Sequence, residues 1–183
     1  MGTAGAMDRG SSQPERARAG GVNAVLLCPG PSLFDVRIGE LDRKTIIAVN
    51  RAAIISRVGA DWWAVSDWPM ARDNRHILVG RPQWFAPRDI MSRLGINGVS
   101  MEDLQYPTAC AYTACRALVL AHRLGAERID VYGADWTDEP DADGIQFAGN
   151  NRDARRWKVE RETWDAVALW LQGQGVTVNR VVR

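Results

Sequence analysis

Polar residues that can do chemistry recur at one kind of position in this sequence, directly after a short apolar run. The segment CPGPS at residues 28–32 follows the first run, Asn50 and Arg51 follow the second, Asp67 follows the third, and GAD at residues 133–135 follows a later one. If these runs are parallel strands, their carboxyl ends share one side of a sheet, where open α/β folds bind ligands. The sequence therefore predicts one site that brings these residues together.

The first of these turns offers backbone chemistry. Gly30 permits a close approach of the backbone, and Ser32 can cap the following helix with Asp35 as its reciprocal partner. Exposed amides in such a turn attract phosphate. Pro29 and Pro31 donate no hydrogen bond, however, and the segment matches neither common phosphate-loop pattern. A rigid β-to-α turn without a ligand is the alternative interpretation.

The next two turns supply side chains. Asn50 can pair with a base or a sugar hydroxyl, and Arg51 can pair with phosphate. A helix cap and a solvated arginine are the alternative. Asp67 can hold a ribose, a sugar hydroxyl or a metal ion, or it can simply cap the next helix. Trp68 and Trp136 directly follow Asp67 and Asp135, and we expect both indoles to stack on a sugar or base.

Further candidates lie around the middle of the chain and after Asp135. Thr108 is placed to cap a long helix whose N-terminus favours an anion, and Tyr112 follows one turn later. Asp141 and Asp143 form a DxD element in which two carboxylates can share a divalent cation such as Mg²⁺ or Mn²⁺. A solvated acidic loop without a metal is the alternative for this segment.

Short apolar runs that alternate with helical patterns must position these residues. Continuous Val- and Ile-rich runs are typical of strands covered on both faces. The pattern predicts an α/β protein, a Rossmann-like three-layer sandwich with a mostly parallel central sheet. The predicted strands are Asn23–Cys28, Lys44–Asn50, Trp62–Asp67, Gln83–Ala86, Arg128–Tyr132 and Val176–Val181, and the predicted helices are Ser32–Gly39, Arg51–Val58, Arg88–Leu94, Cys110–Leu124 and Arg152–Gln172.

Length and composition limit the classes of protein to which this chain can belong. The 183 residues suit a single domain at residues 23–183 after a flexible leader at residues 1–22. A net charge of +1 does not favour a nucleic-acid partner. Three cysteines without a CxxC pair predict a reducing, cytoplasmic location. No apolar run approaches the ~20 residues of a membrane-spanning helix. The oligomeric state is left open.

Taken in order, these segments resemble a known group of proteins. Residues 25–33 (VLLCPGPSL) are similar to the first strand and turn of the motility accessory factor and 6-hydroxymethylpterin diphosphokinase-like proteins (domain of unknown function 115) and of the related bacterial sialyltransferases of glycosyltransferase family 42. Residues 46–51 (IIAVNR) resemble their second strand, and residues 62–67 the third strand of the diphosphokinase branch. LGAERI at 124–129 and GAD at 133–135 complete the set, as in short phage or prophage members.

The chain also departs from this pattern. Pro29 stands where the sialyltransferases have Asn, Thr137 stands near the first of their phosphate-binding tyrosines, and no histidine follows His122 to act as their general base. Sialyl transfer with that base is therefore not expected here.

The resemblance implies transfer of a group, foremost glycosyl, from a nucleotide-activated donor. In this scheme Gly30, Pro31 and Ser32 line the nucleotide site, Asn50 holds base or ribose, and Thr108 lies near the leaving phosphate, while Arg51, Trp136, Trp68 and Tyr112 complete the site. Asp67 and Asp135 serve as general base or metal ligand, so Asp135→Asn is expected to abolish turnover with the fold intact.

Two other functions fit the same residues. One is a Mg²⁺-dependent diphosphokinase acting on a small hydroxymethyl acceptor, with Asp67 and Asp135 holding the metal. The other is a nucleotide- or polymer-binding module without turnover, which the missing histidine and the proline-rich turn favour. A nucleic-acid acceptor is a less favoured variant of the first scheme.

Overall fold

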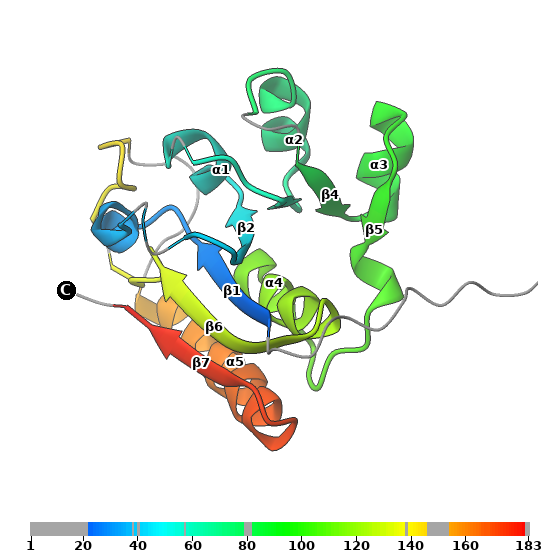
Figure 1. Ribbon diagram of the computed structural model, residues 1–183. Coiled ribbons are helices and arrows are strands. Elements are labelled where there is room, and N and C mark those ends of the chain that lie inside the picture. Colours follow the sequence, from blue (N-terminus) through cyan, green and yellow to red (C-terminus); the bar gives the residue numbers. More distant parts are fainter. Residues whose placement is uncertain are drawn as a thin grey trace, which may run out of the picture.

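The computed structural model describes residues 22–37, 39, 41–56, 58–78, 82–137, 139–145 and 154–181 (Figure 1). The predicted leader lies outside these ranges except for Val22, with which the first strand begins. Among the described residues, no helix combines the length and apolar character needed to cross a membrane.

The described strands form one seven-stranded sheet in which every pair is parallel, with the order β5-β4-β3-β2-β1-β6-β7. The chain first builds the sheet outward from β1 to β5 and then returns to place β6 on the other side of β1. The order therefore reverses between β1 and β6. The strands are β1 Val22–Leu27, β2 Thr45–Val49, β3 Trp62–Ala64, β4 Gln83–Ala86, β5 Gly98–Ser100, β6 Ala126–Tyr132 and β7 Thr177–Arg180.

Helices cover both faces of this sheet, which confirms the predicted three-layer, Rossmann-like sandwich; the sheet is entirely parallel over the described strands. Helices α4 and α5 lie together on one face (Figure 1). The elements η1, α1, α2 and α3 pack against the other face. Their bounds are η1 Pro31–Asp35, α1 Ala52–Ile55, α2 Trp68–Asn74, α3 Arg88–Leu94, η3 Met101–Asp103, α4 Thr113–Arg123 and α5 Ala154–Gly173.

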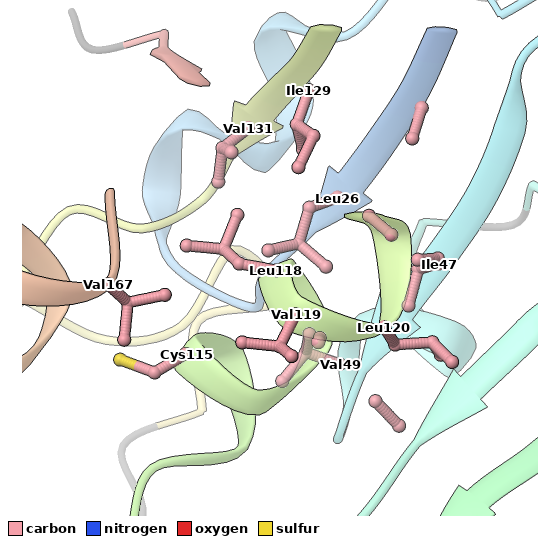
Figure 2. Close-up of a cluster of buried hydrophobic side chains, with 14 of the residues drawn as sticks. Leu26, Ile47, Val49, Cys115, Leu118, Val119, Leu120, Ile129, Val131 and Val167 are labelled. Atoms are coloured by element: carbon pink, nitrogen blue, oxygen red, sulfur yellow. The ribbon is translucent and has the colours of Figure 1, made fainter. Parts of the chain in front are cut away.

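Alternating side chains of the strands divide the core into two halves. In β1, Leu26 belongs to the half under α4 and α5, whereas Val25 and Leu27 belong to the half under the shorter helices. Figure 2 shows the first half, where Leu118 of α4 and Val167 of α5 meet the strands. Because successive side chains of a strand point to opposite faces, only strands that are apolar at every position can serve both halves.

Two elements differ from the prediction. The long middle helix begins at Thr113 and not at Cys110, because the chain is still extended at Tyr112 and Arg116 Nε donates to the carbonyl oxygen of Cys110 at 2.7 Å. Strand β5, which was not predicted, is only three residues long and begins at Gly98. A Cβ at Gly98 would lie 2.3 Å from the carbonyl oxygen of Trp84, so only glycine lets β5 approach β4 this closely.

Candidate functional site

A cavity of about 250 Å³ lies at the carboxyl ends of β1, β2, β3 and β6. It therefore opens where the strand order reverses, the position at which open α/β sheets bind ligands. The first residues of α4 and the first half of α5 complete its wall. The lining residues are Cys28, Pro29, Gly30, Pro31, Val49, Asn50, Ser66, Asp67, Ala111, Tyr112, Thr113, Ala114, Gly133, Ala134, Asp135, Trp136, Thr137, Glu139, Asp141, Arg156, Trp157, Glu160 and Trp164.

The turns after β1 and β6 pack backbone against backbone. The amide of Cys28 donates to the Tyr132 carbonyl at 2.7 Å, and the amide of Gly30 donates to the Gly133 carbonyl at 2.9 Å. A Cβ on Gly133, whose φ is +74°, would lie 1.9 Å from the Cys28 carbonyl oxygen. A Cβ on Gly30 would lie 2.6 Å from the Gly133 carbonyl oxygen. The close approach predicted at Gly30 is thus made to the protein's own backbone.

Asp135, in the turn after β6, connects the two turns by hydrogen bonds to Ser32, in the turn after β1. One carboxylate oxygen accepts from the Ser32 amide at 2.8 Å, and the other accepts from its hydroxyl at 2.5 Å. The same hydroxyl accepts the Gly133 amide at 2.8 Å. Ser32 is buried, it does not line the cavity, and Gly30 holds the N-cap position of η1 without a side-chain hydrogen bond. The predicted helix cap at Ser32 is therefore wrong, since its hydroxyl serves Asp135.

These bonds also overturn the predicted phosphate cradle in the first turn. The amides of Gly30 and Ser32 are both used inside the protein, and the amide of Leu33 donates to the Gly30 carbonyl at 3.0 Å. Pro29 and Pro31 have no amide hydrogen to offer. Gly30 and Pro31 of this turn line the cavity. A phosphate bound there would need hydrogen-bond donors from other residues.

Asn50 lies in the cavity wall at the end of β2 with a left-handed backbone, φ +48°. Its amide donates to the Ala64 carbonyl at 2.8 Å, and its carbonyl accepts from the indole of Trp63 at 2.8 Å. These backbone bonds fix the residue, while its side-chain Oδ1 is buried without a hydrogen-bond partner among the described residues. An unpaired buried acceptor costs about 1–3 kcal/mol, which a ligand that donates to it recovers.

Arg51 and the DxD element bind each other. The guanidinium pairs with Asp143, and it lies 3.8 Å from the Asp141 carboxylate. Arg51 is not among the cavity-lining residues, so the phosphate contact predicted for it gains no support. Asp141 is buried in the wall, whereas Asp143 lies outside it. Within the described part of the chain, no three metal-ligating side chains come together.

Asp67 and the tryptophans that follow Asp67 and Asp135 in the sequence, Trp68 and Trp136, do not all line the cavity. Asp67 lines the cavity, and its Oδ1 caps α2 by accepting from the Met70 amide at 2.9 Å. Trp68 does not line the cavity and has the Arg93 guanidinium 5.3 Å from its ring, so its position gives the predicted stacking at Trp68 no support. Trp136 does line the cavity.

The start of α4 enters the wall, but Thr108 does not. Thr108 is exposed and lies five residues before the helix, so its predicted capping role is wrong. Tyr112 is the N-cap residue and makes no side-chain capping hydrogen bond. Thr113 begins the helix, and its hydroxyl lies 2.5 Å from that of Ser66. The first turn of an α-helix has backbone N–H groups without a partner in the helix, and these can donate hydrogen bonds to an anion.

Sequence reasoning did not assign the cavity residues of α5 or three hydroxyl-bearing neighbours to the site. Arg156, Glu160 and Trp164 follow one another at four-residue spacing, which places them on one face of a helix. That spacing was a readable signal, but the mixed charges around it are equally typical of a solvated face. The residues concerned are Ser66, Thr113, Thr137, Arg156, Trp157, Glu160 and Trp164.

Acidic side chains outnumber basic ones among the described lining residues, and Arg51 from outside the wall pairs with one of them, Asp141. Five of the described lining residues carry a carboxylate and one, Arg156, carries a guanidinium. Burial raises the pKa of the Cys28 thiol well above its usual range, and the charges of Glu160 and Asp135 raise it further. Cys28 is therefore a neutral wall residue and no nucleophile at physiological pH.

Comparisons with protein-family models, curated proteins and solved structures found no significant match to this chain.

Proposed function

We propose that this protein binds a nucleotide-activated donor in the cavity and transfers a group, foremost glycosyl, to an acceptor. One observation carries the proposal: the cavity at the reversal of strand order is lined by Asn50, whose buried Oδ1 has no hydrogen-bond partner among the described residues, and by the N-terminus of α4. The first offers an acceptor for a base or ribose, and the second offers amides for a phosphate. The resemblance of residues 25–136 to nucleotide-dependent transferases supports the same conclusion.

In this proposal the phosphate lies against the first turn of α4. The amides of Thr113 and Ala114 are donors there, and the paired hydroxyls of Ser66 and Thr113 provide further hydrogen bonds. The proposed phosphate site is therefore the first turn of α4 and not the proline-rich turn, where the amides of Gly30 and Ser32 are both used inside the protein.

Asp67 is the better candidate for the general base. Its Oδ1 caps α2, and its Oδ2 has no hydrogen-bond partner among the described residues. Asp135, by contrast, uses both oxygens to hold Ser32. A base must reach the proton that it removes, so a carboxylate with a free oxygen in the cavity fits the role better.

Binding without turnover is the second candidate function. The structural bonds of Asp135 and Asp67 favour it, because both predicted catalytic carboxylates already serve the fold. The diphosphokinase alternative uses the same cavity and would show strict Mg²⁺ dependence and release of AMP from ATP. A cytoplasmic location is proposed from the three free, buried cysteines.

A thermal-shift screen tests the proposal. The panel contains CMP, UDP, GDP, ATP and the corresponding sugar nucleotides, each with and without Mg²⁺ or Mn²⁺. A ligand that binds the native state raises the melting temperature, and at a fixed concentration a tighter ligand raises it more. We expect one nucleotide family to stabilise the protein and its sugar conjugate to be hydrolysed or transferred. Stabilisation without any product supports the binding module, and a flat response to the whole panel contradicts both functions.

A further inference from the structure

Two cysteines stand at the two ends of the segment through which α4 enters the cavity wall. Cys110 lies before the helix, and Cys115 lies in its first turn (Figure 2). The residues between them, 111–114, all line the cavity. Both thiols are free and buried, and they belong to the same half of the core. A covalent bond between them would therefore act directly on the cavity wall.

The side chains of these two cysteines face each other. The thiols of Cys110 and Cys115 share a hydrogen bond. Arg116 holds the main chain of Cys110 in this position, because its Nε donates to the Cys110 carbonyl oxygen at 2.7 Å. A disulfide forms without large backbone movement only where two cysteine side chains already point toward each other at short range. A hydrogen bond between the two thiols meets that condition.

The surroundings of the two thiols give them different reactivity. The hydrogen bond with Cys115 lowers the pKa of the Cys110 thiol, burial opposes this effect, and the charge of Arg116 lowers the pKa further. The hydrogen bond with Cys110 and burial both raise the pKa of the Cys115 thiol. Peroxides oxidise the thiolate form of cysteine. Cys110 is therefore the thiol that reacts first, and Cys115 is the neighbour that can resolve the product.

We propose that Cys110 and Cys115 form a reversible disulfide in response to peroxide, and that this bond constrains the cavity wall at the start of α4. The Cys110 thiolate attacks one oxygen of hydrogen peroxide, the O–O bond breaks, and Cys110 becomes a sulfenic acid while hydroxide leaves. The Cys115 sulfur then attacks the Cys110 sulfur and displaces its hydroxyl group, which leaves as water with the thiol proton. Overall, the two sulfurs lose two electrons to one peroxide, and two thiols give one disulfide and two molecules of water. An effect on donor binding rests on the proposed function, whereas formation of the bond does not.

Thiol titration and peptide mapping of the full chain after treatment with hydrogen peroxide test the bond. The native protein should keep one of its three thiols, the digest should contain Cys110 joined to Cys115, and dithiothreitol should restore all three thiols. Cys28→Ala is the matched control and should lose two thiols as the wild type does. In Cys115→Ala the sulfenic acid of Cys110 has no partner and should be trapped by dimedone, whereas Cys110→Ala should give no dimedone adduct.

Hydrogen exchange of the oxidised and reduced wild type tests the constraint on the wall. The amides of residues 111–116 should exchange about tenfold more slowly in the oxidised chain, because the bond suppresses local opening of the first turn. The amides of α3, which packs against the other face of the sheet, should not change.

Four results would overturn the proposal: retention of all three thiols, a bond that involves Cys28 or a second chain, irreversible oxidation of Cys110 alone, or unchanged exchange at residues 111–116. Peptide mapping of the wild type identifies the bonded pair even if a variant fails to fold. Because no nucleotide is present, failure here leaves the donor site untouched, and failure of the nucleotide screen leaves the disulfide untouched.

Discussion

The bonds between Ser32 and Asp135 predict a large energetic coupling between residues that lie 103 positions apart in the sequence. Ser32→Ala removes a charge-assisted hydrogen bond and leaves the buried Gly133 amide without its acceptor. The first loss costs about 1.5–3 kcal/mol and the second about 1–3 kcal/mol, so we expect Ser32→Ala to lower the free energy of unfolding by about 2.5–6 kcal/mol.

Asp135→Asn tests the same contact from the other side. The amide of asparagine places a donor against one of the two Ser32 donors, so one bond is lost and the free energy of unfolding falls by about 3 kcal/mol. This replaces the expectation that the substitution leaves the fold intact. The double variant shares the lost hydroxyl–carboxylate bond with both single variants, so the coupling energy should be about 1.5–3 kcal/mol.

Urea unfolding at equilibrium measures these values. The wild type, both single variants and the double variant are compared, and the midpoint and slope together show whether unfolding is two-state. Ser92→Ala, a serine substitution at an exposed position of α3, is the control and should change stability by less than about 0.5 kcal/mol. Additive effects of the two substitutions, within about 0.5 kcal/mol, would refute the role assigned to Asp135.

Three further predictions follow from other contacts. Asp67→Asn should leave stability unchanged, because asparagine caps a helix as well as aspartate, but it should abolish turnover if Asp67 is the base. Gly133→Ala should destabilise the protein far more than Gly175→Ala. A Cβ at Gly175 would meet no atom within 4 Å, so that substitution costs only the ~1–2 kcal/mol strain of the left-handed backbone. Burial opposes ionisation of Asp130, yet its hydrogen bonds from Asn179, Lys44 and Arg128 outweigh burial and lower its pKa. The stability from this lowered pKa is present above about pH 4 and is lost as the pH falls further.

Each of these has a direct check. Turnover and urea unfolding of Asp67→Asn are measured together, and full activity in this variant excludes Asp67 as the base. Equal stability of the two glycine variants would contradict the close packing at Gly133. For Asp130, unfolding is followed between about pH 5 and about pH 3 in the wild type and in Asp130→Asn. The wild type should lose more stability over this range, and parallel curves would contradict the assignment.

The sheet was predictable because its strands are short, apolar at nearly every position and separated by helical patterns. β1 meets this description closely, whereas β6 has charged residues between its apolar ones; the predicted ranges of both strands overlap the observed ones. β5 does not, because three residues beginning with Gly98 carry no periodicity. The start of α4 was missed because Cys110 has the small size and spacing of a helix residue, while its carbonyl is held by Arg116 in an extended segment.

The candidate site was predictable only in its location. Parallel strands place Gly30, Asn50, Asp67 and Asp135 near one another, and all four line the cavity. Their hydrogen-bond partners were not predictable, because the Ser32–Asp135 contact depends on tertiary register between segments far apart in the chain. Adjacency in sequence does not fix the position of a side chain either: Trp68 directly follows the cavity residue Asp67 but packs against the other half of the core.

In the proposed function a nucleotide binds with its base or ribose on Asn50. Calorimetric titration of the nucleotide that stabilises the protein most, into the wild type and into Asn50→Gly, tests it most directly. Glycine suits the left-handed backbone at this position and keeps the backbone bonds to Ala64 and Trp63. We predict an unchanged fold and an affinity lower by about tenfold, since one hydrogen bond to the ligand is lost. Equal affinity in the two proteins, or no nucleotide binding to the wild type, would contradict the account.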